Sequence, residues 1–73
     1  MLDLLMATGP LVLHDVHVLH ATDLGWLCRV GEAQVFIAKL EVDPEVLMPA
    51  EGERGTVIVQ AYAVERVRKF LRA

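Results

Sequence analysis

All three histidines of this 73-residue chain lie in one short stretch, residues 13–20, with two residues between successive histidines. Imidazole binds metal ions and titrates near neutral pH, so His14, His17 and His20 raise two hypotheses, a metal site and an acid–base device. Cys28, the single cysteine, raises a third, because a thiol beside a histidine can act as a nucleophile. The element that carries the histidines decides between these chemistries.

The histidine stretch is predicted to be a strand, residues 11–21, because its β-branched valines oppose a helix. Side chains alternate along a regular strand, so His17 faces away from His14 and His20. His14 and His20 then lie about 20 Å apart, too far for one metal ion to bind both. The sequence therefore predicts structural histidines and no metal site within one chain. A site that gathers one histidine from each of several copies on a symmetry axis stays open, as does a response to pH.

Residues 22–25, Thr-Asp-Leu-Gly, are typical of a turn, and its length sets the register of the first hairpin. A three-residue loop that ends in the glycine places His20 opposite Cys28 and puts Val12 on the inner face with the two valines that follow. A two-residue loop reverses the faces. In the first register His20 and Cys28 are the one two-ligand metal candidate, and two ligands make a weak site.

The second hairpin is defined more clearly by its turn. Two predicted strands, residues 26–30 and 33–42, flank Gly31-Glu32, and glycine in the first loop position is typical of a type II′ turn. This loop places Cys28 on a face whose cross-strand pairs are all apolar, and a cysteine in such a place is usually inert packing.

The opposite face of the second hairpin pairs Leu27 with Phe36, which we expect to form an outward apolar patch with Leu19. The hydrophobic content of the chain is 55%, above the ~45–50% that is usual for soluble domains. A chain of this length has a core too small to hide that much apolar surface. We therefore expect a homo-oligomer that covers the patch.

The remaining segments follow from turn residues and from the period of the apolar positions: residues 1–10 as an N-terminal arm, 45–53 as a loop with a short turn, 54–61 as a strand and 62–72 as a helix. The predicted fold is mainly β and forms one domain, residues 11–73. It is a small antiparallel β-barrel or a rolled sheet of four or five strands, closed by the C-terminal helix.

Charge is unevenly distributed along the chain, whose formal net charge is −3. All ten acidic residues fall within the first 65 positions, and the predicted helix holds four of the seven basic ones: Arg66, Arg68, Lys69 and Arg72. A basic helix end can bind phosphates, with Tyr62 stacking on a base, or can dock on a partner protein. It also suits the negative end of the helix dipole, and the acidic remainder of the chain opposes a polyanion.

Nothing in the sequence brings an acid, a base and a nucleophile together, so neither an enzyme nor a cofactor is predicted. Gly52 and Gly55 lack the Lys-Ser/Thr of a phosphate-binding loop, and Glu51 and Glu53 have no partner acid on a second element. One cysteine fits a reducing compartment. No apolar stretch approaches the ~18–20 residues of a membrane span, and the first residues lack the basic region of a signal peptide, so we expect a cytoplasmic protein.

The second half of the chain carries a resemblance. Residues 36–39, Phe-Ile-Ala-Lys, lie in the predicted third strand, and residues 52–59, Gly-Glu-Arg-Gly-Thr-Val-Ile-Val, lead into the next strand. This pattern resembles short bacterial and phage proteins of unknown role, in which a strand ending in Trp-Ile-Pro-Lys precedes Gly-x-x-Gly and an apolar strand. Ala38 and Gln60 stand where those proteins have prolines, and Tyr62 where they have a tryptophan. The resemblance implies a small SH3-like barrel and no active site.

A second resemblance covers residues 54–71, a glycine-led apolar strand that enters a short basic helix. This stretch is similar to the swapped-hairpin DNA-binding family of antitoxins and transition-state regulators, where another strand follows the helix. Two functions are therefore expected. The first is a non-catalytic binding or assembly module, a homo-oligomer that holds a protein or small ligand at its subunit interfaces. The alternative is a nucleic-acid-binding regulator that uses the basic helix.

Overall fold

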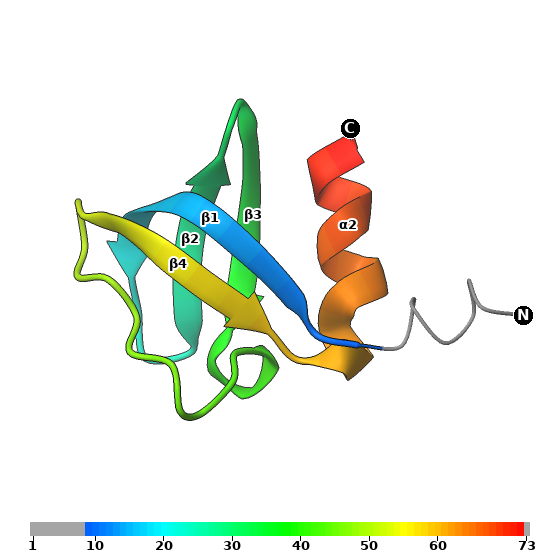
Figure 1. The fold of residues 1–73 in the computed structure, drawn as a ribbon. Coiled ribbons are helices and arrows are strands. Elements are labelled where there is room, and N and C mark those ends of the chain that lie inside the picture. Colours follow the sequence, from blue (N-terminus) through cyan, green and yellow to red (C-terminus); the bar gives the residue numbers. More distant parts are fainter. Residues whose placement is uncertain (1–8, 73) are drawn as a thin grey trace, which may run out of the picture.

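The computed structural model of the protein describes residues 9–72. Most of the predicted N-terminal arm, residues 1–10, lies outside this range. The described chain contains four strands, two 3₁₀ turns and one α-helix (Figure 1): β1 (Leu11–Ala21), β2 (Gly25–Val30), β3 (Ala33–Ala38), η1 (Lys39–Glu41), β4 (Arg54–Val59), η2 (Ala61–Ala63) and α2 (Val64–Arg72). None of the described helices has both the length and the apolar character needed to cross a membrane.

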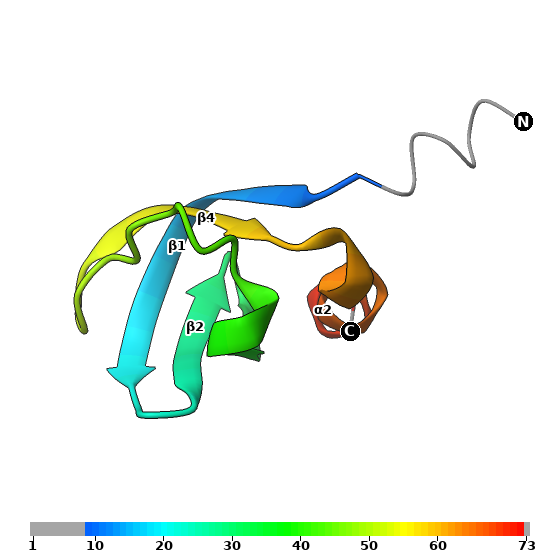
Figure 2. The ribbon, with the colours of Figure 1, turned by 90° about the horizontal axis from the view of Figure 1, so that it is seen from below.

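The four strands form one antiparallel sheet in the order β3-β2-β1-β4. The first strand is therefore central and pairs with both β2 and β4. The sheet is strongly twisted, with β1 and β4 running obliquely across β2 and β3, and α2 lies beside β3 (Figures 1 and 2). These features confirm the predicted mainly-β fold with a C-terminal helix, in its rolled form, because the sheet is open.

The β2–β3 hairpin has the predicted register throughout, from Val30↔Ala33 to Trp26↔Ile37. Gly31 has a φ of 62°, the positive value that the first position of a type II′ turn requires. The third strand is shorter than predicted and ends at Ala38.

The early end of the third strand has a local cause. The Glu41 carboxylate accepts the N–H of Ala38, and the chain turns into η1 there. Val42, which was predicted to end the third strand, instead forms an isolated bridge with Val59 of β4.

Two bulges interrupt β1, one in its pairing with β4 and one in its pairing with β2. The first lies between Leu13, which pairs with Val57, and Val16, which pairs with Gly55. Asp15 within it has a φ of 55°, a conformation that aspartate tolerates better than most residues.

The second bulge lies between Val18 and His20, so that Val18 pairs with Cys28 and His20 pairs with Leu27. The predicted opposition of His20 and Cys28 is therefore wrong. Ala21 pairs with Trp26, so the loop comprises residues 22–25 and is one residue longer than predicted. The bulge then shifts the ladder by one further residue on the other side of His20.

The core lies on the concave inner face of the sheet and is built mainly from valine. Val16 and Val18 are fully buried there as predicted, whereas Val12 is 44% exposed on the outer face because the first bulge reverses the alternation. The fully or nearly buried residues are Leu13, Val16, Val18, Cys28, Val35, Ile37, Val42, Val57, Val59, Ala63, Val64 and Val67.

Helix α2 covers the free edge of β3. Val64 and Val67 enter the core, and Arg66 binds the Glu41 carboxylate. Arg66 also donates a hydrogen bond of 2.8 Å to the carbonyl oxygen of Phe36, a group on the unpaired side of β3. Because an uncovered strand edge is open to pairing with another chain, this contact both orients the helix and protects the sheet.

Candidate functional site

The two bulges bring all three histidines to the outer face of the sheet, which corrects the predicted alternation. His14 is 3.5 Å from the Thr56 hydroxyl, His17 lies between the two fully buried valines, and His20 is 3.8 Å from the Glu51 carboxylate. Among residues 9–72, no three histidine, cysteine or acidic side chains are arranged to hold a metal ion.

Cys28 is fully buried on the inner face, and its thiol lies 3.8 Å from the carbonyl oxygen of Trp26. Burial raises the pKa of this thiol from 9.0 to about 11, because the charged thiolate is poorly solvated there. With no histidine across from it, the side chain has the features of core packing.

The predicted outer patch is assembled by the sheet. Leu27 pairs directly with Phe36, and Leu19 sits in the second bulge beside Leu27. Phe36 is 39% exposed, while the two leucines are half-buried. Part of the Phe36 ring serves the fold, because it lies over Gly25, where a Cβ would come within 2.9 Å of it.

The basic side chains of α2 do not act as one free cationic group. Arg66 is held by Glu41 and by the β3 edge, and its guanidinium lies 6.0 Å from the centre of the Phe70 ring. Lys69 is exposed and Arg68 is half-buried. Tyr62 is 68% exposed, and its hydroxyl donates to the carbonyl oxygen of Leu40.

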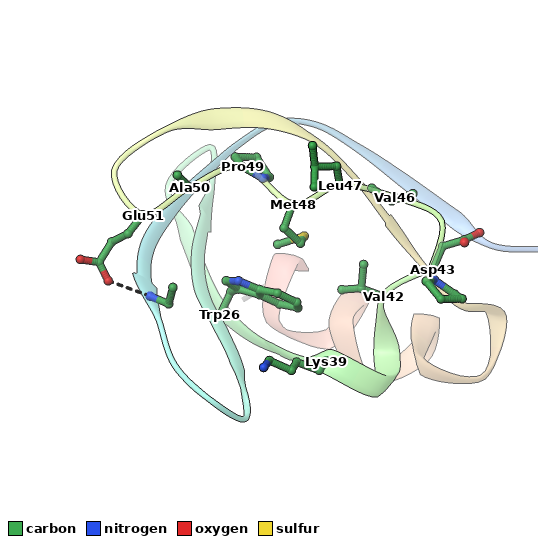
Figure 3. Close-up of a pocket in the computed structure, with 12 residues that line it drawn as sticks. Trp26, Lys39, Val42, Asp43, Val46, Leu47, Met48, Pro49, Ala50 and Glu51 are labelled. Carbon is green, nitrogen blue, oxygen red and sulfur yellow. Dashed lines mark hydrogen bonds between the residues drawn. The ribbon is translucent and has the colours of Figure 1, made fainter.

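A pocket that the sequence did not predict opens between β2, η1 and the loop that leads to β4 (Figure 3). Its volume of about 440 Å³ falls within the range of small-molecule sites. The indole of Trp26 lies at its centre with Met48 across from it, and Lys39 lies on the opposite side from the loop (Figure 3). The lining residues are Ala21, Trp26, Lys39, Val42, Asp43, Pro44, Val46, Leu47, Met48, Pro49, Ala50 and Glu51.

The loop wall of the pocket, residues 42–53, is fixed at both ends although it contains no regular element. The N–H of Asp43 donates to Ile58 of β4, and the N–H of Gly52 donates to Val18 of β1. Next to Gly52, Glu51 accepts the N–H of Ala21 at 2.8 Å (Figure 3). The loop therefore holds the pocket open without needing a ligand to order it.

Large apolar side chains on the pocket wall and on the segments connected to it are left in solvent. Leu47, on its wall, is 94% exposed and Leu40, next to Lys39, is 81% exposed. Leu24 is 77% exposed, and its carbonyl accepts the Lys39 N–H, while Tyr62 donates to Leu40. We call this region, with its four side chains Leu24, Leu40, Leu47 and Tyr62, the η1 end. Exposed apolar side chains that gather at one end of a fold are typical of interaction sites.

A partial signal for the η1 end is present in the sequence. Trp26 is the single tryptophan, and Val46-Leu47-Met48-Pro49 is an apolar run inside a predicted loop. This run lacks the periodic pattern of a buried helix or strand, which indicates that it is exposed. The run alone does not reveal that η1 and Trp26 lie opposite it.

Comparisons with protein-family models, with curated proteins and with solved structures found no match. The two resemblances of the sequence therefore stay expectations, and the geometry of the pocket carries the functional argument.

Proposed function

We propose that this protein is a non-catalytic binding and assembly module whose ligand site is the pocket at the η1 end. The observation that carries the proposal is the combination of a preformed, largely apolar pocket with the exposed Leu47 on its wall and three further exposed apolar side chains at the η1 end. A ligand that covers exposed apolar surface removes it from water, and this stabilises the complex by about 25 cal/mol per Å².

The chemistry of the pocket favours binding over catalysis. Its charged lining groups are Lys39, Asp43 and Glu51. Asp43 accepts the N–H of Glu45 and Glu51 accepts that of Ala21, so both carboxylates already shape the loop. The pocket lining holds neither histidine nor cysteine, and the proposed role is to hold an apolar group.

The expected ligand is an apolar small molecule or an apolar side chain of a protein, and the expected assembly is a homo-oligomer. The buried thiol of Cys28 fits a reducing compartment, so the proposed location is the cytoplasm. The twisted sheet with its capping helix is compatible with the SH3-like class that the first resemblance implies.

The test is a titration with indole, a small apolar probe, followed by amide NMR spectra. We expect amide shifts confined to the residues that line the pocket. Leu47→Ser should weaken indole binding about fivefold, because it removes roughly 1 kcal/mol of apolar contact. Val12→Ser is the matched control, since Val12 is an exposed apolar residue on the outer face.

The fold is not at risk in this comparison, because Leu47 is almost wholly exposed. Shifts spread over the outer face, or equal loss of affinity in the two variants, would overturn the proposal that the η1 end is the ligand site.

A further inference from the structure

The loop wall of the pocket is acidic at both of its ends, on either side of the apolar residues 46–50. Residues 43–53 contain Asp43, Glu45, Glu51 and Glu53 and no lysine or arginine. Three of these carboxylates accept only backbone N–H groups, and within residues 9–72 none of the four pairs with a lysine or arginine. His20 lies 3.8 Å from Glu51, and Lys39 lies across the pocket from the loop (Figure 3). The pocket therefore suits an apolar group that carries cations beside it.

The C-terminal end of α2 has the complementary composition. Phe70 is 47% exposed and follows Arg68 and Lys69, which form no ion pair within the described residues. The ring of Phe70 is already partly ordered by the guanidinium of Arg66, 6.0 Å from its centre. An exposed aromatic ring flanked by cations is the kind of side chain that anchors an interface.

We propose that the C-terminal end of α2 in one copy docks on the η1 end of a second copy. Phe70 enters the pocket beside Trp26, and Arg68 and Lys69 lie against the carboxylates of the 43–53 loop. The inference rests on the proposed role of the pocket and names its occupant. Apolar and electrostatic complementarity act together, since the ring covers apolar surface while the cations neutralise the loop.

The placement of the two surfaces makes the contact intermolecular. The C-terminal end of α2 and the η1 end lie at opposite ends of the molecule (Figure 1). Two antiparallel copies related by a two-fold axis can make the contact twice, which closes a dimer. A head-to-tail arrangement would instead leave one surface of each kind free.

The first experiment measures the dimerisation constant of the full chain by sedimentation and light scattering over a wide concentration range. Phe70→Ser should weaken association at least tenfold, as expected for a central aromatic anchor. Glu45→Lys and Lys69→Glu should each weaken it several-fold, because each places like charges together. Arg29→Glu is the matched control, a similar charge change on the outer face of β2, and should leave association unchanged.

Mixing the two charge variants gives the sharpest result. Chains with Glu45→Lys and chains with Lys69→Glu associate poorly alone, but a mixed dimer restores opposite charges at both contacts. Recovery of association in the mixture supports the proposal, and failure to recover overturns it. Circular dichroism of each variant shows that the fold is retained.

Two other outcomes would also overturn the inference. A protein that is monomeric up to its solubility limit has no such contact, and if it still binds indole, the proposed binding role of the pocket stands without the proposed assembly. A dimer that is insensitive to Phe70→Ser and is broken by Leu27→Ser uses the outer patch instead. If the native chain neither binds indole nor associates, the proposed function is refuted together with this inference.

Discussion

Replacing Gly25 with alanine adds one methyl group where the backbone of β3 leaves no space for it. The new Cβ would lie 2.3 Å from the carbonyl oxygen of Ile37 and 2.7 Å from the Cα of Ala38. It would also lie 2.9 Å from the ring of Phe36. The first two atoms are backbone of the paired strand and cannot rotate away, so the strands must separate locally.

The expected loss of stability is at least about 3 kcal/mol. Overpacking costs about 1–3 kcal/mol where side chains yield, and here the backbone of β3 has to move with its neighbouring hydrogen bonds. A chain of this size has a free energy of unfolding of about 4–11 kcal/mol. The single methyl group is therefore expected to remove a large part of the total.

The assay is urea unfolding followed by Trp26 emission and by circular dichroism. Gly9→Ala is the neutral control, because no heavy atom lies within 4 Å of its added Cβ. Gly52→Ala is the conformational control, since its φ of 86° strains an alanine in open space, at about 1–2 kcal/mol. If Gly25→Ala costs no more than Gly52→Ala, the argument from close approach is wrong.

Three further predictions concern titratable groups. Arg66 holds the pKa of Glu41 below its ordinary value of 4.5, so this contact stabilises the fold above that pH and is lost as the pH falls through the lowered pKa. The stability difference between the native chain and Glu41→Gln, measured in urea at several pH values, should therefore shrink in acid. The raised pKa of Cys28 acts in the opposite sense, because the free energy of unfolding should fall from pH 9 to pH 11 as the thiol of the unfolded chain ionises. Cys28→Ala should cost about 1 kcal/mol at neutral pH and should lack this fall. At pH 8 a thiol reagent should modify Cys28 only as fast as the chain opens. Zinc and chelator should each leave the melting temperature unchanged, because among the described residues no three histidine, cysteine or acidic side chains lie together as metal ligands. A rise in the melting temperature with zinc would contradict this.

The β2–β3 hairpin could be predicted because two independent local signals agree on one register. Gly31 favours one turn geometry, and that geometry places apolar residues opposite apolar residues. The valine-rich core and the helix were predictable for the same reason, because period and residue type point to one answer.

The faces of β1 could not be predicted, because a bulge depends on what the neighbouring strands require and not on the strand itself. Each bulge adds a residue on one side of a ladder, and two of them brought His14, His17 and His20 to one face. The pocket was missed for a related reason. Its walls come from a loop without periodicity and from η1, whose position depends on the Glu41 carboxylate meeting Ala38.

The central position of β1 has a consequence for folding kinetics. Strands β1, β2 and β3 follow one another through short turns, so their pairing closes only small loops. Strand β4 must instead find β1 across most of the chain, as in the pair Leu11↔Val59, about fifty positions apart. Closing so long a loop costs chain entropy before the contacts between β1 and β4 stabilise it. The docking of β4 is therefore the expected slow step of folding. Until that step, the η1 end has neither its loop wall nor its pocket, so the capacity to bind develops last.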